Sequence, residues 1–180
     1  MNQLTHTIGK KVLQSRFSKT ERNKCVQNFE TASQAVILFD TDLPQCFAPI
    51  KDFAKFLNQQ DIKTSILGYV PQKDVPQEML LWANIEFLTR KDVSWFGSPK
   101  GAAVETFFKK EPDILFVISF RDILTIEYLT KLSRAKFKVG CYTEKENDLD
   151  FMINSANKDC TVEFFIEQVK HYITLLNPSK

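Results

Sequence analysis

The sequence predicts an α/β fold, a three-layer sandwich around a mostly parallel sheet of five or six strands. Short apolar runs recur along the chain, and stretches long enough for a helix separate most of them. The runs are continuous rather than alternating, which is typical of strands that helices bury on both faces. A length of 180 residues with 43% hydrophobic residues suits one domain of ordinary size. The predicted strands are residues 35–40, 64–70, 85–88, 113–118 and 137–141.

A basic segment precedes this domain. Residues 4–17 place apolar side chains at helical spacing, which predicts an amphipathic helix, and residues 18–33 have the composition of a polar linker. We therefore divide the chain into a helix and linker over 1–33 and one domain over 34–180. Residues 1–24 carry a net charge of +5 and the remainder −3. Such a helix suits an anionic lipid surface, nucleic acid, a second copy in a homodimer, or the domain itself.

Helices are predicted after most strands. Thr41 and Asp42 follow the first strand and are expected to cap a helix that begins near Pro44. Ser119 and Asp122 have the spacing of a capping box, which opens a helix after the fourth strand. Apart from the helix near Pro44, the predicted helices are residues 77–83, 102–110, 122–134 and 161–176.

The last strand is predicted to run against the others. An apolar run over 149–153 follows the fifth strand after only a few residues, whereas a parallel crossover needs a dozen or more. Residues 145–148 are a credible turn, so we expect a hairpin and an antiparallel sixth strand. The whole arrangement predicts a Rossmann-like sandwich.

A ligand site is expected where the strand order reverses. If the order is 3-2-1-4-5, that point lies between the first and fourth strands. The residues delivered there include Asp40, Thr41, Ser119 and Arg121. Their carboxylate, hydroxyls and guanidinium at two helix starts suit a phosphate-bearing small molecule. In the alternative reading the hydroxyls cap helices and Arg121 pairs with a neighbouring acid.

A second candidate is the loop around Trp95. Gly97 and Lys100 belong to the segment that leads into helix 102–110. Backbone N–H groups and a lysine at a helix start are suited to bind a phosphate. Trp95 is placed to stack on a base or sugar, or else to close the sheet edge as an apolar plug. The loop lacks the spacing of a Walker A or dinucleotide motif.

The sequence assigns no catalytic residue, metal site or cofactor. Its four cysteines and two histidines have no metal-ligand spacing, and neither histidine follows a strand. No apolar stretch approaches the roughly 18 residues that a membrane span needs, and no secretory signal is visible. Free thiols without an export signal favour the cytoplasm.

Three resemblances accompany these patterns. Asp40-Thr-Asp42 is similar to the first motif of haloacid-dehalogenase-like phosphotransferases, which implies magnesium-dependent phosphoryl transfer, but Leu43-Pro44 replaces the family's Gly-Thr. Trp95-Phe-Gly-x-Pro-Lys100 and Phe137-Lys-Val-Gly140 resemble a bacterial family of uncharacterised proteins, which implies no activity. Residues 113–118 and 132–140 are similar to the N-terminal domain of heptosyltransferase-like glycosyltransferases, which supports the fold.

Three functions fit the sequence. The first is a non-catalytic domain that binds a ligand or partner, which agrees with the lack of a catalytic motif. The second is an enzyme acting on a phosphate-bearing small molecule, such as a sugar phosphate or nucleotide sugar, at the strand ends. The third is a protein that docks on nucleic acid or a membrane surface through its basic arm.

Overall fold

The computed structural model describes residues 11, 22–154 and 161–178. The predicted helix over 4–17 lies outside these residues except for Lys11, so the role of the basic arm stays a prediction. Residues 22–33, expected to be a polar linker, pack against the domain instead. Phe29 is 7% exposed and meets the Phe56 ring edge to face at 5.3 Å. The Asn28 side-chain amide donates to the Leu176 carbonyl at 3.0 Å.

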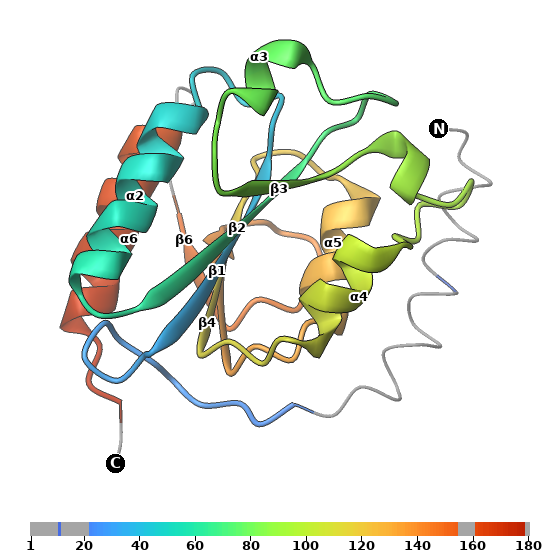
Figure 1. Cartoon of the computed structure of the whole chain (residues 1–180). Helices are drawn as coiled ribbons and strands as arrows, with labels where there is room; N and C mark the ends of the chain where they lie inside the picture. The colour runs from blue at the N-terminus through green and yellow to red at the C-terminus, as the bar shows by residue number, and fades with distance from the viewer. Residues whose placement is uncertain (1–10, 12–21, 155–160, 179–180) are drawn as a thin grey trace.

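The centre of the molecule is a six-stranded sheet with the order β3-β2-β1-β4-β5-β6 (Figure 1). Every pair of neighbouring strands is parallel. This confirms the α/β class and the parallel sheet, and it places the reversal of strand order between β1 and β4. The strands are β1 (Gln34–Asp40), β2 (Lys63–Tyr69), β3 (Ile85–Leu88), β4 (Ile114–Ile118), β5 (Phe137–Cys141) and β6 (Phe151–Ile153).

Helices cover both faces of the sheet, as Figure 1 shows. Alternate residues of β1 enter the two cores: Ile37 and Phe39 pack toward α2 and α6, while Val36 and Leu38 pack toward α4 and α5. All four are 3% exposed or less, so β1 is buried on both faces, as its continuous apolar run predicts. The helices are α2 (Phe47–Gln59), α3 (Gln77–Leu80), α4 (Ala102–Lys109), α5 (Leu124–Leu132) and α6 (Val162–Leu175), with a short 3₁₀ turn at Arg90–Asp92.

Two helices begin later than predicted. α2 begins at Phe47 and α5 at Leu124, and neither has a side-chain cap. The predicted caps are wrong because their polar groups bond elsewhere. The Thr41 hydroxyl donates to the Tyr69 carbonyl at 2.9 Å, and the Ser119 hydroxyl donates to the Arg121 carbonyl at 3.1 Å. The residues between strand and helix therefore form turns at the carboxyl edge of the sheet.

The predicted antiparallel direction of the last strand is wrong. β6 runs parallel to β5, with Val139 opposite Phe151 and Cys141 opposite Ile153. A connection of nine residues, 142–150, suffices because β6 is only three residues long. The chain must therefore return along β5 by only about 10 Å before it pairs.

This β5–β6 connection (residues 142–150) lies against the sheet rather than projecting as a hairpin turn. The Lys138 N–H donates to the Asp150 carboxylate at 2.9 Å, and the Asp150 N–H donates to the Lys138 carbonyl at 2.9 Å. A Cβ added to Gly140 would lie 2.7 Å from Leu149 Cδ1, so this glycine permits the close approach. The connection thus becomes a wall beside α5.

No helix within the described ranges is long and apolar enough to cross a bilayer. Cys25, Cys46 and Cys141 are free thiols. Burial raises the pKa of the Cys46 thiol to about 11, so this thiol is neutral at neutral pH.

Candidate functional site

The predicted ligand site between β1 and β4 contains a network of ion pairs. Arg121 donates from Nε and Nη2 to the two carboxylate oxygens of Asp40, at 2.7 and 2.8 Å. Nη2 also donates to Asp42 at 3.1 Å. The Asp40 side chain is fully buried, whereas that of Arg121 is 49% exposed. We call this network, Asp40, Asp42 and Arg121, the β1–β4 crevice.

Both carboxylates hold the guanidinium in its charged form. The hydrogen bond from Arg121 to Asp40 is the main cause that raises the pKa of Arg121 above its usual range. An incoming phosphate would have to compete with two carboxylates already bound to this guanidinium. The arrangement corresponds to the alternative reading in which Arg121 pairs with neighbouring acids.

The other predicted residues of this crevice bond locally. Thr41 is 4% exposed and its hydroxyl bonds the β2 backbone, while the half-buried Ser119 bonds the backbone two residues on. The structure thus brings Asp40, Thr41, Ser119 and Arg121 to one edge, as the topology predicts, but the side chain of each already has a hydrogen-bond partner within the chain.

The Trp95 loop closes on itself. Val93 and Pro99 form an antiparallel bridge, and the N–H groups of Gly97 and Ser98 bond the Ser94 carbonyl and hydroxyl, at 3.1 and 3.0 Å. Two backbone donors of the predicted phosphate cradle are therefore engaged inside the loop. Trp95 is 60% exposed, so it does not form a buried plug.

A pocket of about 410 Å³ lies between this loop and the ends of β2 and β4. Gly97 and Arg121 both line it, so the structure brings these two predicted residues together. Trp95 and the exposed Lys100 lie outside its lining. Gly97 has a φ of +89°, and a Cβ there would lie 2.7 Å from Leu124 Cδ2, so glycine is required for the loop to rest on α5.

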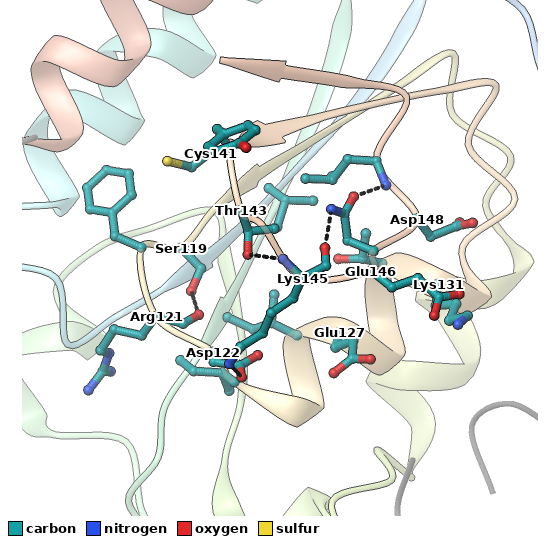
Figure 2. Close-up of a pocket in the computed structure, with 18 residues that line it drawn as sticks. Ser119, Arg121, Asp122, Glu127, Lys131, Cys141, Thr143, Lys145, Glu146 and Asp148 are labelled. Carbon is teal, nitrogen blue, oxygen red and sulfur yellow. Dashed lines mark hydrogen bonds and ion pairs between the residues drawn. The ribbon is translucent and has the colours of Figure 1, made fainter. Parts of the chain in front are cut away.

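A second pocket, of about 320 Å³, also has Arg121 in its lining (Figure 2). Three segments form it: the β4–α5 turn, α5 and the β5–β6 connection. We call it the α5 pocket. Ser119 and Arg121 line it with Val117, Phe120, Asp122, Ile123, Ile126, Glu127, Thr130, Lys131, Cys141, Tyr142, Thr143, Lys145, Glu146, Asn147, Asp148 and Leu149.

Thr130 is the unusual residue of the α5 pocket. It is 6% exposed, and its buried hydroxyl has no hydrogen-bond partner in the part of the chain that the structure describes. A helical threonine commonly donates to the carbonyl three or four residues earlier, but Thr130 does not. Burying a hydroxyl without a partner costs about 1–3 kcal/mol.

The basic side chains that line the α5 pocket have acidic partners or other interactions. Lys145 pairs with Asp122, and Arg121 points away from Lys145 (Figure 2). Arg121 pairs instead with Asp40. Lys131 is also engaged. The hydrogen bond to Asp122 raises the pKa of Lys145, and the charge of Glu127 adds to this shift.

A buried ion pair fixes the wall of the pocket. The Lys138 side chain is 0% exposed and pairs with Asp148, which is 9% exposed. Burial lowers the pKa of Lys138 to about 8, although the bond to Asp148 opposes the shift. Lys138 also donates to the Lys131 carbonyl at 3.3 Å, which ties the connection to the end of α5.

Sequence reasoning missed this pocket. It identified Ser119 and Arg121, which line the pocket, as candidate ligand-binding residues. It identified none of the lining residues from α5 or from the β5–β6 connection. An antiparallel hairpin would have projected residues 142–148 beyond the sheet, so the wrong strand direction removed one wall. Thr130 gives no signal in the sequence, since a threonine on a helix usually has a backbone partner.

No group of three or more potential ligands among His, Cys, Asp and Glu is arranged to hold a metal ion in the described residues. The Asp40-Thr-Asp42 motif offers no free carboxylate pair, because both acids bind Arg121.

Comparison with known families gives a match over most of the chain. Residues 6–176 match a family described as "Family of unknown function (DUF6913)". The match covers nearly the whole chain, so the protein belongs to this family, and the predicted resemblance to a family of uncharacterised proteins is confirmed. The comparison with curated proteins finds no similar protein.

Proposed function

We propose that this member of a family of unknown function is a non-catalytic domain that binds a small organic molecule in the α5 pocket. The observation that carries the proposal is the buried Thr130 hydroxyl without a partner at the pocket wall. Folded chains satisfy nearly all buried polar groups, so an exception at a pocket points to a partner from outside the chain.

The size and position of the pocket support a small molecule. A volume of about 320 Å³ falls within the range of ligand sites. The pocket opens at the carboxyl ends of β4 and β5, the edge at which open parallel sheets bind ligands. Its lining combines apolar side chains such as Ile126 and Leu149 with a larger number of polar and charged ones, so a ligand there would need polar groups as well as an apolar part.

The chemistry of the lining favours binding over catalysis. Nucleophilic catalysis needs a nucleophile within hydrogen-bond reach of a base. Cys141 lines the pocket, but His171 lies on α6, which covers the opposite face of the sheet. The lysines and Arg121 are held by partners, so none is presented as a proton donor or acceptor.

A thermal-shift screen of metabolite-like amines, alcohols, acids, sugars and nucleotides tests this proposal. A ligand at about 100 times its dissociation constant adds roughly 2.7 kcal/mol, a shift of several degrees for a domain of this size. We expect Thr130→Val to reduce the shift and weaken binding about fivefold to tenfold.

Thr125→Val is the matched control. It removes the same atom from the same helix, but the Thr125 hydroxyl already donates to the Gly97 carbonyl at 3.3 Å and lies outside the α5 pocket. Thr125→Val should lower the melting temperature yet leave the ligand shift intact. Equal loss of the shift in both variants, or a ligand that binds Thr130→Val as well as wild type, contradicts the proposal.

A second candidate function is the binding, and enzymatic turnover, of a phosphate-bearing small molecule at Arg121. It is supported by the half-exposed guanidinium, which borders both pockets at the point where the strand order reverses. Sugar phosphates and nucleotide sugars in the same screen test it. A shift that Arg121→Lys abolishes while the protein stays folded favours it, because lysine keeps the charge but loses the bidentate geometry.

A further inference from the structure

We infer that the α5 pocket selects organic cations, that is, small molecules in which a protonated amine is joined to an apolar body. This inference rests on the proposed function, since it assigns a ligand class to the same pocket. Two independent observations carry it: the charges of the lining residues and the unpartnered hydroxyl of Thr130.

The charges of the lining leave negative charge in excess. Asp122, Glu127, Glu146 and Asp148 are acidic, whereas Arg121, Lys131 and Lys145 are basic. Asp122 and Asp148 neutralise lysines, and Arg121 is neutralised by two acids behind the pocket.

The lining charges outside these ion pairs are two carboxylates, Glu127 and Glu146, and one lysine, Lys131, which leaves a net charge of −1. The side chains of Glu127 and Glu146 form no hydrogen bond and no ion pair with other residues that the structure describes. Glu127 acts on Lys145 through its charge, without an ion pair between them. Figure 2 places Glu127 of α5 and Glu146 of the β5–β6 connection on the same side of the pocket. A cation between them would gain two acceptors, and an anion there would be repelled.

The Thr130 hydroxyl adds an acceptor one helical turn from Glu127. Residues three apart on a helix lie on the same face, and both residues line the pocket. An ammonium group has three donors and no acceptor, so it matches a hydroxyl oxygen together with carboxylates. The apolar side chains of Val117, Ile126 and Leu149 are available to the hydrocarbon part of the ligand.

Three probes with one body and different head groups test this ligand class. They are 2-phenylethylamine, 2-phenylethanol and 3-phenylpropionate, titrated to 10 mM into the ¹⁵N-labelled full chain and followed by amide chemical shifts. We expect the amine to move the amides of α5 and of residues 142–149, with an affinity about tenfold above that of the alcohol. The propionate should move them least.

Two charge variants sharpen the test. Glu127→Gln should weaken the binding of the amine about threefold to tenfold and leave the affinity for the alcohol unchanged. Glu163→Gln makes the same charge change at an exposed position of α6, on the opposite face, and should change neither. A uniform loss in both variants would indicate long-range electrostatics and overturn the assignment to this pocket.

The outcomes separate this inference from the proposed function. If the propionate or the alcohol binds the α5 amides as tightly as the amine, the cation class is wrong while the pocket remains a binding site. If none of the three probes moves these amides, the inference is overturned. A metabolite that shifts the melting temperature through Thr130 then still supports the proposed function, and a flat screen removes both.

Discussion

The β1–β4 crevice and the α5 pocket lie side by side at the carboxyl edge of the sheet, yet their polar groups are used in opposite ways. In the crevice, the carboxylates of Asp40 and Asp42 bind Arg121, and the chain satisfies its own charges. In the α5 pocket, the Thr130 hydroxyl is buried without a partner in the described chain, and acidic groups exceed basic ones. The topological rule selects this edge of the sheet, and the two regions on it differ in whether their polar groups have partners within the chain.

The largest losses of stability should come from substitutions in the β1–β4 crevice. Arg121→Met leaves the fully buried Asp40 carboxylate without its partner, and we expect a loss of about 3 kcal/mol in the free energy of unfolding. Asp40→Asn leaves a guanidinium that is half exposed and solvated by water, so its loss should be about 1 kcal/mol.

Urea denaturation of both variants measures this asymmetry. Equal losses would show that the two partners are equally solvated. A fully stable Arg121→Met protein would mean that the crevice is not a structural network, and the second candidate function would gain support.

A similar loss is expected at the wall of the α5 pocket. Asp148→Asn leaves the Lys138 ammonium buried without a counter-charge and should cost about 3 kcal/mol. The pair replacement of Lys138→Met with Asp148→Leu should recover most of that stability, because it removes both buried charges. If the single variant is as stable as wild type, the connection is not held by this ion pair.

Two glycine substitutions compare the regions directly. A Cβ on Gly68 would meet the buried Phe39 ring and Thr41 Cγ2 at 2.9 Å, and Gly68→Ala should cost about 1–3 kcal/mol without affecting ligands. A Cβ on Gly140 would lie 2.7 Å from the flexible end of the Leu149 side chain, which lines the α5 pocket, and 3.3 Å from the Val117 carbonyl oxygen. Gly140→Ala should therefore cost less stability but reduce ligand binding. The reverse pattern in denaturation and thermal-shift experiments would contradict the comparison.

The pH dependence of stability gives a smaller effect. The pKa of Lys138 is lowered to about 8, below its ordinary value of 10.5, so above pH 8 the unfolded chain binds a proton that the folded chain has released. The contribution of Lys138 to stability should therefore rise with pH, by at most about 1.4 kcal/mol per pH unit.

The window from pH 8 to 9 isolates this effect. Above pH 9 the Cys46 thiol acts in the opposite direction, because its pKa is raised to about 11 and the unfolded chain loses that proton first. The stability of wild type relative to the Lys138→Met, Asp148→Leu variant, measured by urea denaturation, should increase between pH 8 and 9. A flat or falling difference contradicts a lowered pKa at Lys138.

The sequence was sufficient to predict most strands of the sheet, but it did not predict the direction of the last one. Continuous apolar runs predicted β1 to β5, because a strand that is buried on both faces has apolar residues at nearly every position. The direction of β6 depends on contacts far apart in the chain: Asp148 with Lys138, Asp150 with the Lys138 backbone, and Leu149 against Gly140. No local pattern encodes them.

The candidate site was predictable only in part, for a related reason. Topology brings Asp40 and Arg121 together, so their meeting follows from the strand order. Whether an arginine binds a ligand or an acid of its own chain depends on side-chain geometry that a sequence does not show. The missing partner of Thr130 is likewise a property of packing.

The most direct test of this account is the stability of Thr130→Val without any ligand. Since the hydroxyl has no partner to lose, the account predicts a free energy of unfolding equal to or above that of wild type, while Thr125→Val loses about 1 kcal/mol. If Thr130→Val loses as much as Thr125→Val, the hydroxyl is already satisfied within the folded chain. The argument for a ligand in the α5 pocket would then be contradicted.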